Sequence, residues 1–121
     1  MIRVLLVEDN DVYRSSLELL LALQAGIEVV GAVGAGNEAA AAATRHRAGV
    51  VLMDYRLPGL DGAAATREVI AASGAAVVCL TAEATAQERE EIVRAGASAL
   101  VEKGDPMEAL AAAIRAAAPM I

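Results

Sequence analysis

The chain has 121 residues, of which 57% are hydrophobic and 2% aromatic, and its formal net charge is −6. This length fits a single domain over 1–121, and the acidic balance disfavours direct nucleic-acid binding, which needs a basic face. Much of the apolar fraction comes from 30 alanines, and no apolar run approaches the roughly 18 residues of a membrane-spanning helix. Because the N-terminus lacks the pattern of a secretory signal, we expect a cytoplasmic location without a membrane anchor.

Short apolar segments alternate with longer segments of helical periodicity along the whole chain. Such alternation is typical of βα units built around a parallel sheet. Strands are expected over 2–7, 27–33, 50–53, 76–80 and 99–101. Helices are expected over 11–25, 37–47, from 61 or 62 to 73, over 85–95 and from 106 onward, with an apolar stripe that reaches 118. Five such units are too few for an eight-stranded barrel, so the sequence predicts an α/β fold with an open, doubly wound sheet.

The first and last helices carry explicit sequence signals. In the last helix we expect Asp105 as the N-cap, Pro106 at the first helical position and Glu108 at capping-box spacing. The first helix is expected to stop near Gly26. The residues that recur there at helical spacing are Val12, Ser16, Leu19, Leu20 and Leu23. In the fourth helix, the charged run over 88–91 predicts a solvated face with internal ion pairs, and a partner surface is the alternative.

Polar side chains follow four of the five expected strands. In an open α/β sheet, ligands bind beyond the carboxyl ends of the strands, near the point where the strand order reverses. With a strand order of 2-1-3-4-5, the four polar ends are neighbours and the unreactive end of the second strand lies at the sheet edge. The residues collected in this way are Glu8, Asp9, Asp54, Thr81, Glu102 and Lys103. The sequence therefore predicts one polar cleft at the carboxyl end of the sheet.

Three carboxylates in this cleft would repel one another unless a cation intervened. Mg²⁺ is the expected ion, because it prefers oxygen ligands and typically uses one or two carboxylates together with a substrate phosphate. Asp9 and Asp54 can supply the carboxylates, and Glu8 can act directly or through water. The backbone carbonyl of Arg56 is a further candidate ligand of the metal.

The same cleft suits a phosphoryl group held between a metal ion and an ammonium group. Lys103, the only lysine of the chain, supplies the ammonium, and Thr81 supplies a hydroxyl donor. The single histidine, His46, lies in an expected helix that is remote from the strand ends, so a nucleophile here must be a carboxylate. Asp54 is the best candidate, because it is central among the strand ends and aspartyl phosphates are an established covalent form.

At these residues the sequence resembles the receiver domains of two-component response regulators, over residues 2–118. The matching residues are Glu8-Asp9, the segment from Asp54 to Gly62, Thr81-Ala82, Gly96-Ala97 and Lys103. The segments 54–62 and 102–106 are most similar to receivers of the LuxR/NarL kind, which are attached to a helix-turn-helix output domain.

The resemblance implies a flavodoxin-like fold of order 2-1-3-4-5, in which Asp54 accepts a phosphoryl group from a sensor histidine kinase. It also implies that Asp9 binds Mg²⁺ with help from Glu8, that Thr81 reorients toward the phosphoryl group and that Lys103 pairs with it. Such domains catalyse their own phosphorylation from small donors and their own hydrolysis. They switch conformation to control an output, here expected to be transcription. A homodimer through the first and last helices is also open.

Two positions depart from the family pattern. Leu100 stands three residues before the lysine, where family members usually carry an aromatic side chain that swings inward with the threonine. Gly104 follows the lysine, where many receivers have a proline in a cis peptide. We therefore expect the phosphorylation chemistry to persist and its readout to differ.

Three other functions stay open from the sequence. A degenerate receiver that binds partners without phosphorylation is favoured only by Leu100. An aspartyl phosphohydrolase would carry a second acid two residues after the nucleophile, where this chain has Arg56. A flavin-binding module would carry a hydroxyl- and glycine-rich phosphate loop after the first strand, where the acidic segment 8–11 would instead repel a phosphate.

Overall fold

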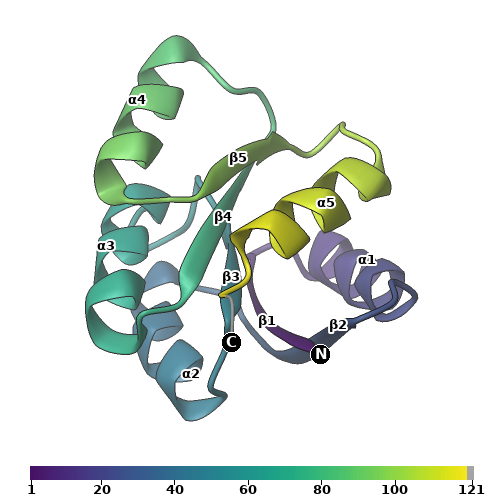
Figure 1. Cartoon of the computed structure of the whole chain (residues 1–121). Helices are drawn as coiled ribbons and strands as arrows, with labels where there is room; N and C mark the ends of the chain where they lie inside the picture. Colours follow the sequence, from purple (N-terminus) through teal and green to yellow (C-terminus); the bar gives the residue numbers. More distant parts are fainter. Residues whose placement is uncertain (120–121) are drawn as a thin grey trace.

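A computed structural model, which describes residues 1–119, shows a parallel sheet with helices on both faces (Figure 1). The strands are β1 (Ile2–Val7), β2 (Ile27–Val33), β3 (Val50–Asp54), β4 (Ala76–Thr81) and β5 (Ala99–Glu102). The helices are α1 (Asp11–Ala22), α2 (Ala39–Arg45), α3 (Gly62–Ser73), α4 (Ala86–Ala95) and α5 (Met107–Ala117), with a short 3₁₀ helix η1 (Gly36–Glu38) before α2. The strand order β2-β1-β3-β4-β5, with every pairing parallel, confirms the predicted fold class and topology.

The central strands are apolar on both faces because helices cover both faces. Along β3 and β4, Val51 and Val77 belong to the core beneath α2, α3 and α4, whereas Leu52 and Val78 belong to the core beneath α1 and α5. This alternation follows from the two-residue period of a strand. Within residues 1–119, no helix is both long and apolar enough to cross a membrane.

Helix α1 is shorter than predicted, and its buried side chains are not among the residues that marked it by their spacing. It ends at Ala22, and the chain then turns into β2 through Gly26, which adopts a left-handed φ of +80°. The predicted end at residue 25 is wrong because this turn occupies the intervening residues. Leu17 and Leu21 are its buried side chains. Among the residues that marked this helix by their spacing, the exposed large apolar side chains are Val12, Leu19, Leu20 and Leu23.

The segment predicted as a helix over 37–47 is wrong at both ends. It opens with the 3₁₀ helix η1, and α2 itself ends at Arg45. Arg47 takes a left-handed φ of 53°, and the N–H of Ala48 donates to the carbonyl of Ala43 at 3.0 Å. This bond is the one that closes a Schellman motif at the end of a helix. It pairs the Ala43 carbonyl, which would otherwise accept the next N–H of a longer helix.

Two predictions about helix ends and faces need correction. The N-cap of α5 is Pro106, without a side-chain cap, while the Asp105 carboxylate accepts the N–H of Glu102 at 3.2 Å. In α4, Thr85 and Glu88 form a complete capping box, and Glu88 is only 5% exposed. The run over 88–91 is therefore not a uniformly solvated face, because its first residue turns inward to cap the helix.

Candidate functional site

The carboxyl ends of β1, β3, β4 and β5 meet at one end of the sheet, and the predicted polar residues gather there. Asp54 is the last residue of β3 and Thr81 the last of β4, whereas Glu8 and Lys103 follow directly after β1 and β5. Glu8, Asp54 and Thr81 are 2%, 5% and 1% exposed. The N–H of Lys103 donates to the carbonyl of Thr81 at 2.8 Å, which fixes the lysine beside β4.

Lys103 bridges two carboxylates that come from different strands. Its Nζ lies 2.8 Å from Oε1 of Glu8 and 3.4 Å from Oδ2 of Asp54. The same ammonium lies 4.6 Å from the centre of the Tyr13 ring, within the range of a cation–π contact. Burial alone would lower the pKa of Lys103, but the hydrogen bond to Glu8 and the charge of Asp54 outweigh it and raise that pKa. The lysine is therefore a fixed positive charge in the cleft.

The two buried carboxyl groups have pKa values displaced in opposite directions. Burial raises the pKa of Asp54 to about 6, with a further contribution from the negative charge of Glu8. Burial also opposes ionisation of Glu8, but hydrogen bonds from Lys103 and from the backbone N–H of Asn10 lower its pKa. The cleft thus holds more negative charge than Lys103 alone can neutralise, which is the condition under which a cation is attracted.

Glu8, Asp9 and Asp54 form the acidic cluster of the site. Each offers a carboxylate oxygen within 4.8 Å of the others. Opposite ligands of an octahedral magnesium ion lie about 4 Å apart, so small side-chain movements bring this oxygen set to the ion. Glu8 and Asp54 are buried and Asp9 is exposed, which leaves one side open for water or a phosphate oxygen. The residues present therefore fit Mg²⁺.

The loop after Asp54 is held against the start of α3. The backbone N–H of Arg56 donates to Oδ1 of Asp54 at 3.2 Å, and the N–H of Gly62 donates to the carbonyl of Tyr55 at 3.0 Å. A Cβ on Gly62 would lie 2.6 Å from the Cα of Tyr55 and 2.7 Å from the carbonyl oxygen of Asp54. Only glycine allows this close approach, so Gly62 helps to position the backbone around Asp54.

Side chains of the same loop also contact α4. The Arg56 guanidinium lies 3.3 Å from Oε2 of Glu88. The Tyr55 hydroxyl donates to Oε2 of Glu91, and this hydrogen bond raises the pKa of Tyr55 to about 12. The loop that carries Asp54 is therefore linked to α4 by two side-chain contacts.

The Thr81 hydroxyl contacts groups on the α4 side of the cleft. It donates toward the carbonyl of Glu83 at 3.3 Å and toward Oε1 of Glu88 at 3.4 Å. Glu102, the remaining residue of the predicted cleft, accepts the N–H of Ala84 at 3.3 Å. The structure thus brings Glu8, Asp9, Asp54 and Lys103 together, whereas Thr81 and Glu102 contact the β4–α4 loop.

Two residues that carry no motif of the predicted site, Asn10 and Arg14, contact Glu8, and a third, Tyr13, contacts Lys103. The backbone N–H of Asn10 donates to Oε2 of Glu8 at 3.0 Å, while the Asn10 side chain caps α1 by accepting the N–H of Tyr13 at 2.9 Å. Arg14 donates to the Glu8 carbonyl at 2.6 Å and pairs with Asp11. Asn10 before a helical segment is a recognisable N-cap signal, and Arg14 three residues after Asp11 has the spacing of a helical ion pair. The contact of Tyr13 with Lys103 depends on tertiary structure.

Comparisons with known proteins agree with this geometry. The family described as "Response regulator receiver domain" matches residues 4–115. The response regulator GacA of Pseudomonas aeruginosa is 34% identical over 95% of this chain and 54% of its own length. A LuxR-family two-component response regulator from Aurantimonas has a TM-score of 0.86 at 27% identity, covering 98% of this chain and 88% of that structure.

A third similar protein has a metal in the corresponding type of domain. The receiver domain of the sensor histidine kinase PA1611 from Pseudomonas aeruginosa has a TM-score of 0.83 at 36% identity, covering 95% of each chain. Its structure contains a magnesium ion coordinated in the active-site cleft.

The fold, the acidic cleft and these matches define a signalling domain of two-component systems. The chain belongs to the response regulator receiver family, and it is similar to LuxR/NarL-type members. It spans about half the length of the curated relatives it matches, including GacA.

Proposed function

We propose that this receiver domain accepts a phosphoryl group on Asp54 from the phosphohistidine of a sensor histidine kinase. The observation that carries the proposal is the position of Asp54. It is a buried carboxylate at the end of a central strand, between the acidic residues that follow β1 and the ammonium of Lys103. In the transfer, an oxygen of Asp54 forms the bond to phosphorus while the bond from phosphorus to the histidine nitrogen breaks, and the imidazole leaves with a proton from solvent.

We assign the metal site to Glu8, Asp9 and Asp54, with the carbonyl of Arg56 as a further predicted ligand. A magnesium ion bound there would offset the repulsion between the carboxylate nucleophile and the anionic phosphoryl donor. Asp54 would keep one oxygen for attack, and Glu8 would also balance the charge of Lys103, whose Nζ lies 2.8 Å from Oε1 of Glu8. Asp9 is exposed, so it would bind the metal ion from the solvent side of the site.

Lys103 and Thr81 are proposed to respond to the new charge on Asp54. Lys103 Nζ is already 3.4 Å from Oδ2 of Asp54, so a short movement brings it to a phosphoryl oxygen. The Thr81 hydroxyl would leave its acceptors at Glu83 and Glu88 and turn toward the same group. Because Glu88 lies on α4, this reorientation would change the contacts of that helix, which provides a route to a switch.

We propose that the output of the switch is control of transcription. LuxR/NarL-type similarity supports control of transcription through a helix-turn-helix partner domain, and phosphotransfer from a sensor kinase would take place in the cytoplasm. Leu100 packs partly buried against the core beneath α2, α3 and α4, so the readout would proceed without an aromatic side chain at this position. A degenerate receiver is not favoured, because the acidic cluster, Asp54, Thr81 and Lys103 are all present.

The direct test is incubation of the purified chain with a small phosphoryl donor, with and without Mg²⁺, followed by intact-protein mass spectrometry. We expect one added phosphoryl group that requires Mg²⁺, is stable in acid and is lost in base. Asp54→Asn should abolish the addition, whereas Asp11→Asn, at an exposed carboxylate outside the acidic cluster, should not. A chain that takes up no phosphoryl group from any donor would identify the degenerate receiver instead.

A further inference from the structure

A pocket lies at the end of the sheet opposite the acidic cluster. Its volume is roughly 610 Å³, and it opens beside Ile2, the first residue of β1. Because β1 is six residues long, this pocket is about 20 Å from the acidic residues that follow the other end of the strand. Small-molecule sites typically measure about 300–1,000 Å³. We call it the arginine pocket, because its charged side chains are those of Arg3, Arg47 and Arg115.

Three separate segments bring these arginines together. Arg3 lies on β1, Arg47 follows α2, and Arg115 lies in the last turn of α5. Three of the ten basic side chains of an acidic chain therefore meet at one pocket. Arg47 has the left-handed φ of 53° at the end of α2, a conformation that glycine adopts without a steric penalty. The chain thus places a guanidinium group here at a conformational cost.

Backbone carbonyls hold two of the guanidinium groups in place. Nη2 of Arg3 donates to the carbonyl of His46 at 2.7 Å, and Nη2 of Arg115 donates to the carbonyl of Ala25 at 3.0 Å. A guanidinium group carries five N–H donors, so each of the two keeps donors for a further acceptor. Its planar fork matches the oxygens of a carboxylate or a phosphate. Two of the three arginines are therefore oriented before any ligand binds.

The positive charge of the arginine pocket is only weakly compensated. Arg47 and Arg115 form no ion pair with a side chain of residues 1–119. Arg3 has one acidic neighbour, since its Nη1 lies 3.8 Å from Oε1 of Glu28, and both side chains are about half exposed. Among the described residues that line the pocket, none is acidic. A bound anion would therefore contact these cations without displacing a strong internal partner.

Apolar groups form most of the remaining lining of the pocket. They come from the start of β1, from the turn before β2 and from the end of α5, and they are Met1, Ile2, Ala25, Ala118 and Pro119. An inorganic anion would leave these groups in contact with water, whereas an organic body would cover them. The lining therefore favours a ligand that joins a charged head to an apolar body.

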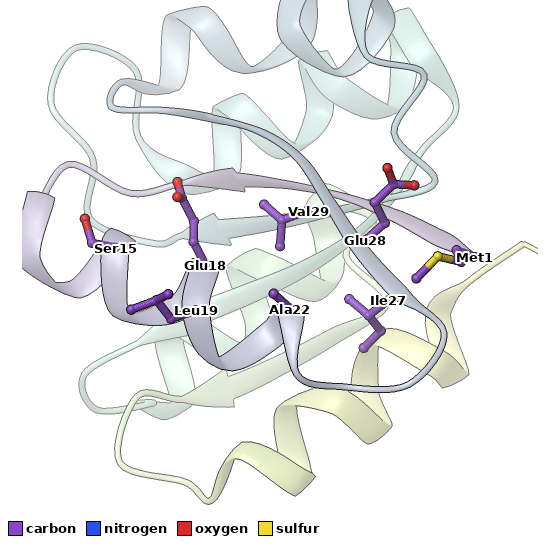
Figure 2. Close-up of a pocket in the computed structure, with 8 residues that line it drawn as sticks. All are labelled: Met1, Ser15, Glu18, Leu19, Ala22, Ile27, Glu28 and Val29. Atoms are coloured by element: carbon purple, nitrogen blue, oxygen red, sulfur yellow. The ribbon is translucent and has the colours of Figure 1, made fainter.

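The neighbouring groove has the opposite charge. It lies between α1 and β2, and Met1 lines both it and the arginine pocket. Figure 2 shows the side chains of this groove, of which Glu18 and Glu28 are charged. These carboxylates would repel an anion. Of the two hollows that share Met1, the arginine pocket is the one that suits an anionic ligand.

From these observations we propose that the arginine pocket binds a small amphipathic anion. The carboxylate or phosphate head of this ligand contacts Arg47 and Arg115, and its apolar body covers the surface formed by Ile2, Ala118 and Pro119. The pocket contains no residue of the acidic cluster, so binding needs neither Mg²⁺ nor a phosphoryl group on Asp54. Failure of this proposal would leave the phosphorylation proposal intact.

The first experiment is a titration of the ¹⁵N-labelled chain with 2-naphthoate, followed by NMR at neutral pH in the presence of a chelator. The backbone amide signals of Gly26, Gly49 and Ala118 should shift, and those of Asp9 and Asp54 should not. The uncharged 2-naphthol should bind about tenfold more weakly, because it lacks the oxyanion that the guanidinium groups bind. Added salt should weaken the binding of 2-naphthoate and leave that of 2-naphthol unchanged.

Acetate and 2-naphthyl phosphate complete the set of probes. Acetate has the charge without the apolar body, so it should bind more weakly than 2-naphthoate. Comparison of 2-naphthyl phosphate with 2-naphthoate shows which oxyanion the pocket prefers. Equal affinity for 2-naphthoate and 2-naphthol, or shifts at Asp9 and Asp54 in place of the pocket, would overturn the proposal.

Substitutions test which residues hold the anion. Arg47→Gln and Arg115→Gln should each weaken the binding of 2-naphthoate by about fivefold, with little change for 2-naphthol. Ala25→Glu should abolish the binding, because the new carboxylate would lie at the pocket beside Arg115, and Ala25 is exposed enough to accept it. Arg67→Gln is the matched control, since Arg67 is exposed on α3 and lies outside the pocket. Loss of binding in the control to the same extent would show that net charge alone attracts the anion, and would contradict the assigned site.

Discussion

Lys103 and Asp54 are 49 positions apart in the sequence, yet Nζ of the lysine lies 3.4 Å from Oδ2 of the aspartate. The parallel sheet creates this proximity, because β3 and β5 flank β4 and end at the same edge. A second carboxylate, Glu8, holds the same ammonium at 2.8 Å. One positive charge thus pairs with two buried carboxylates, which leaves an excess of negative charge in the site. This excess determines how the site should respond to pH, to metal binding and to substitution.

Stability of the metal-free chain should depend on the ionisation of Asp54. Its pKa is raised by burial from 3.8 to about 6, so the fold favours the protonated form. Well below pH 4 the group is protonated in both folded and unfolded chains. As the pH rises from about 4 to 6, Asp54 ionises in the unfolded chain before it ionises in the folded chain, so the folded state loses stability over this range. Asp54→Asn removes this loss and should raise the free energy of unfolding by on the order of 2 kcal/mol at about pH 8, with little gain near pH 4.

Urea unfolding at both pH values in the presence of a chelator measures this difference. Asp11→Asn serves as the control, because its carboxylate is exposed and should leave the pH dependence unchanged. An Asp54→Asn chain that is less stable than the parent at about pH 8 would show that Lys103 fully compensates the Asp54 charge.

Removal of Lys103 should make the thermal stability of the chain more dependent on Mg²⁺ bound at the acidic cluster. Lys103→Ala leaves Glu8 and Asp54 without their shared cation, so the metal-free variant should unfold at a lower temperature at neutral pH. Mg²⁺ should then raise its Tm by more than it raises that of the parent, since the ion replaces part of the missing charge. Thermal unfolding with and without MgCl₂ gives both values. Arg94→Ala, which removes a surface cation paired with Glu90, should show the parental response to Mg²⁺.

Gly62 should be intolerant of even one added methyl group. Gly62→Ala places a Cβ against the backbone of Asp54 and Tyr55, so the loop must shift and stability should fall by about 1–3 kcal/mol. Phosphoryl uptake should fall with it, because the shifted backbone carries Asp54. Gly104→Ala is the matched control, since a Cβ there meets no atom within 4 Å. Equal stability of the two variants by urea unfolding would refute the close approach.

Glu88 should stabilise the start of α4 through its contacts with the Thr85 N–H and Arg56. Glu88→Ala loses both and should cost about 1 kcal/mol of stability. Glu88→Gln keeps an acceptor for the Thr85 N–H and should recover most of that loss. Exposed Glu90→Ala on the same helix should be close to neutral. Urea unfolding of the three variants checks this order, and a Gln variant as unstable as the Ala variant would argue against a capping role.

The fold was predictable because its strands are continuous apolar runs and its turns lie at clear glycine and proline positions. The buried face of α1 was not, for a physical reason. Leucines occupy positions 17, 19, 20, 21 and 23, so apolar side chains cover roughly 200° of the helix surface. Spacing alone cannot decide which side meets the sheet, and the side with Leu17 and Leu21 is the one that does.

The site was predictable in part, because carboxyl ends of parallel strands converge and place Glu8, Asp54 and Lys103 together. The contact of Lys103 with Tyr13, and those of Thr81 and Arg56 with Glu88, join separate elements and leave no local pattern in the sequence. Glu88 could be noticed only as the third residue after a capping threonine. The contacts of the Glu88 carboxylate with Thr81 and Arg56 beside the cleft became visible only in the structure.

The most direct test of the account is to locate the phosphoryl group on the chain. After phosphorylation with a small donor and Mg²⁺, borohydride reduction converts an aspartyl phosphate to homoserine, and peptide mass spectrometry identifies the residue. We expect the conversion at Asp54 alone, with none in the Asp54→Asn variant or when a chelator replaces Mg²⁺. Conversion at Asp9 or another carboxylate in the parent chain, with Asp54 unmodified, would contradict the assignment of Asp54 as the phosphoacceptor.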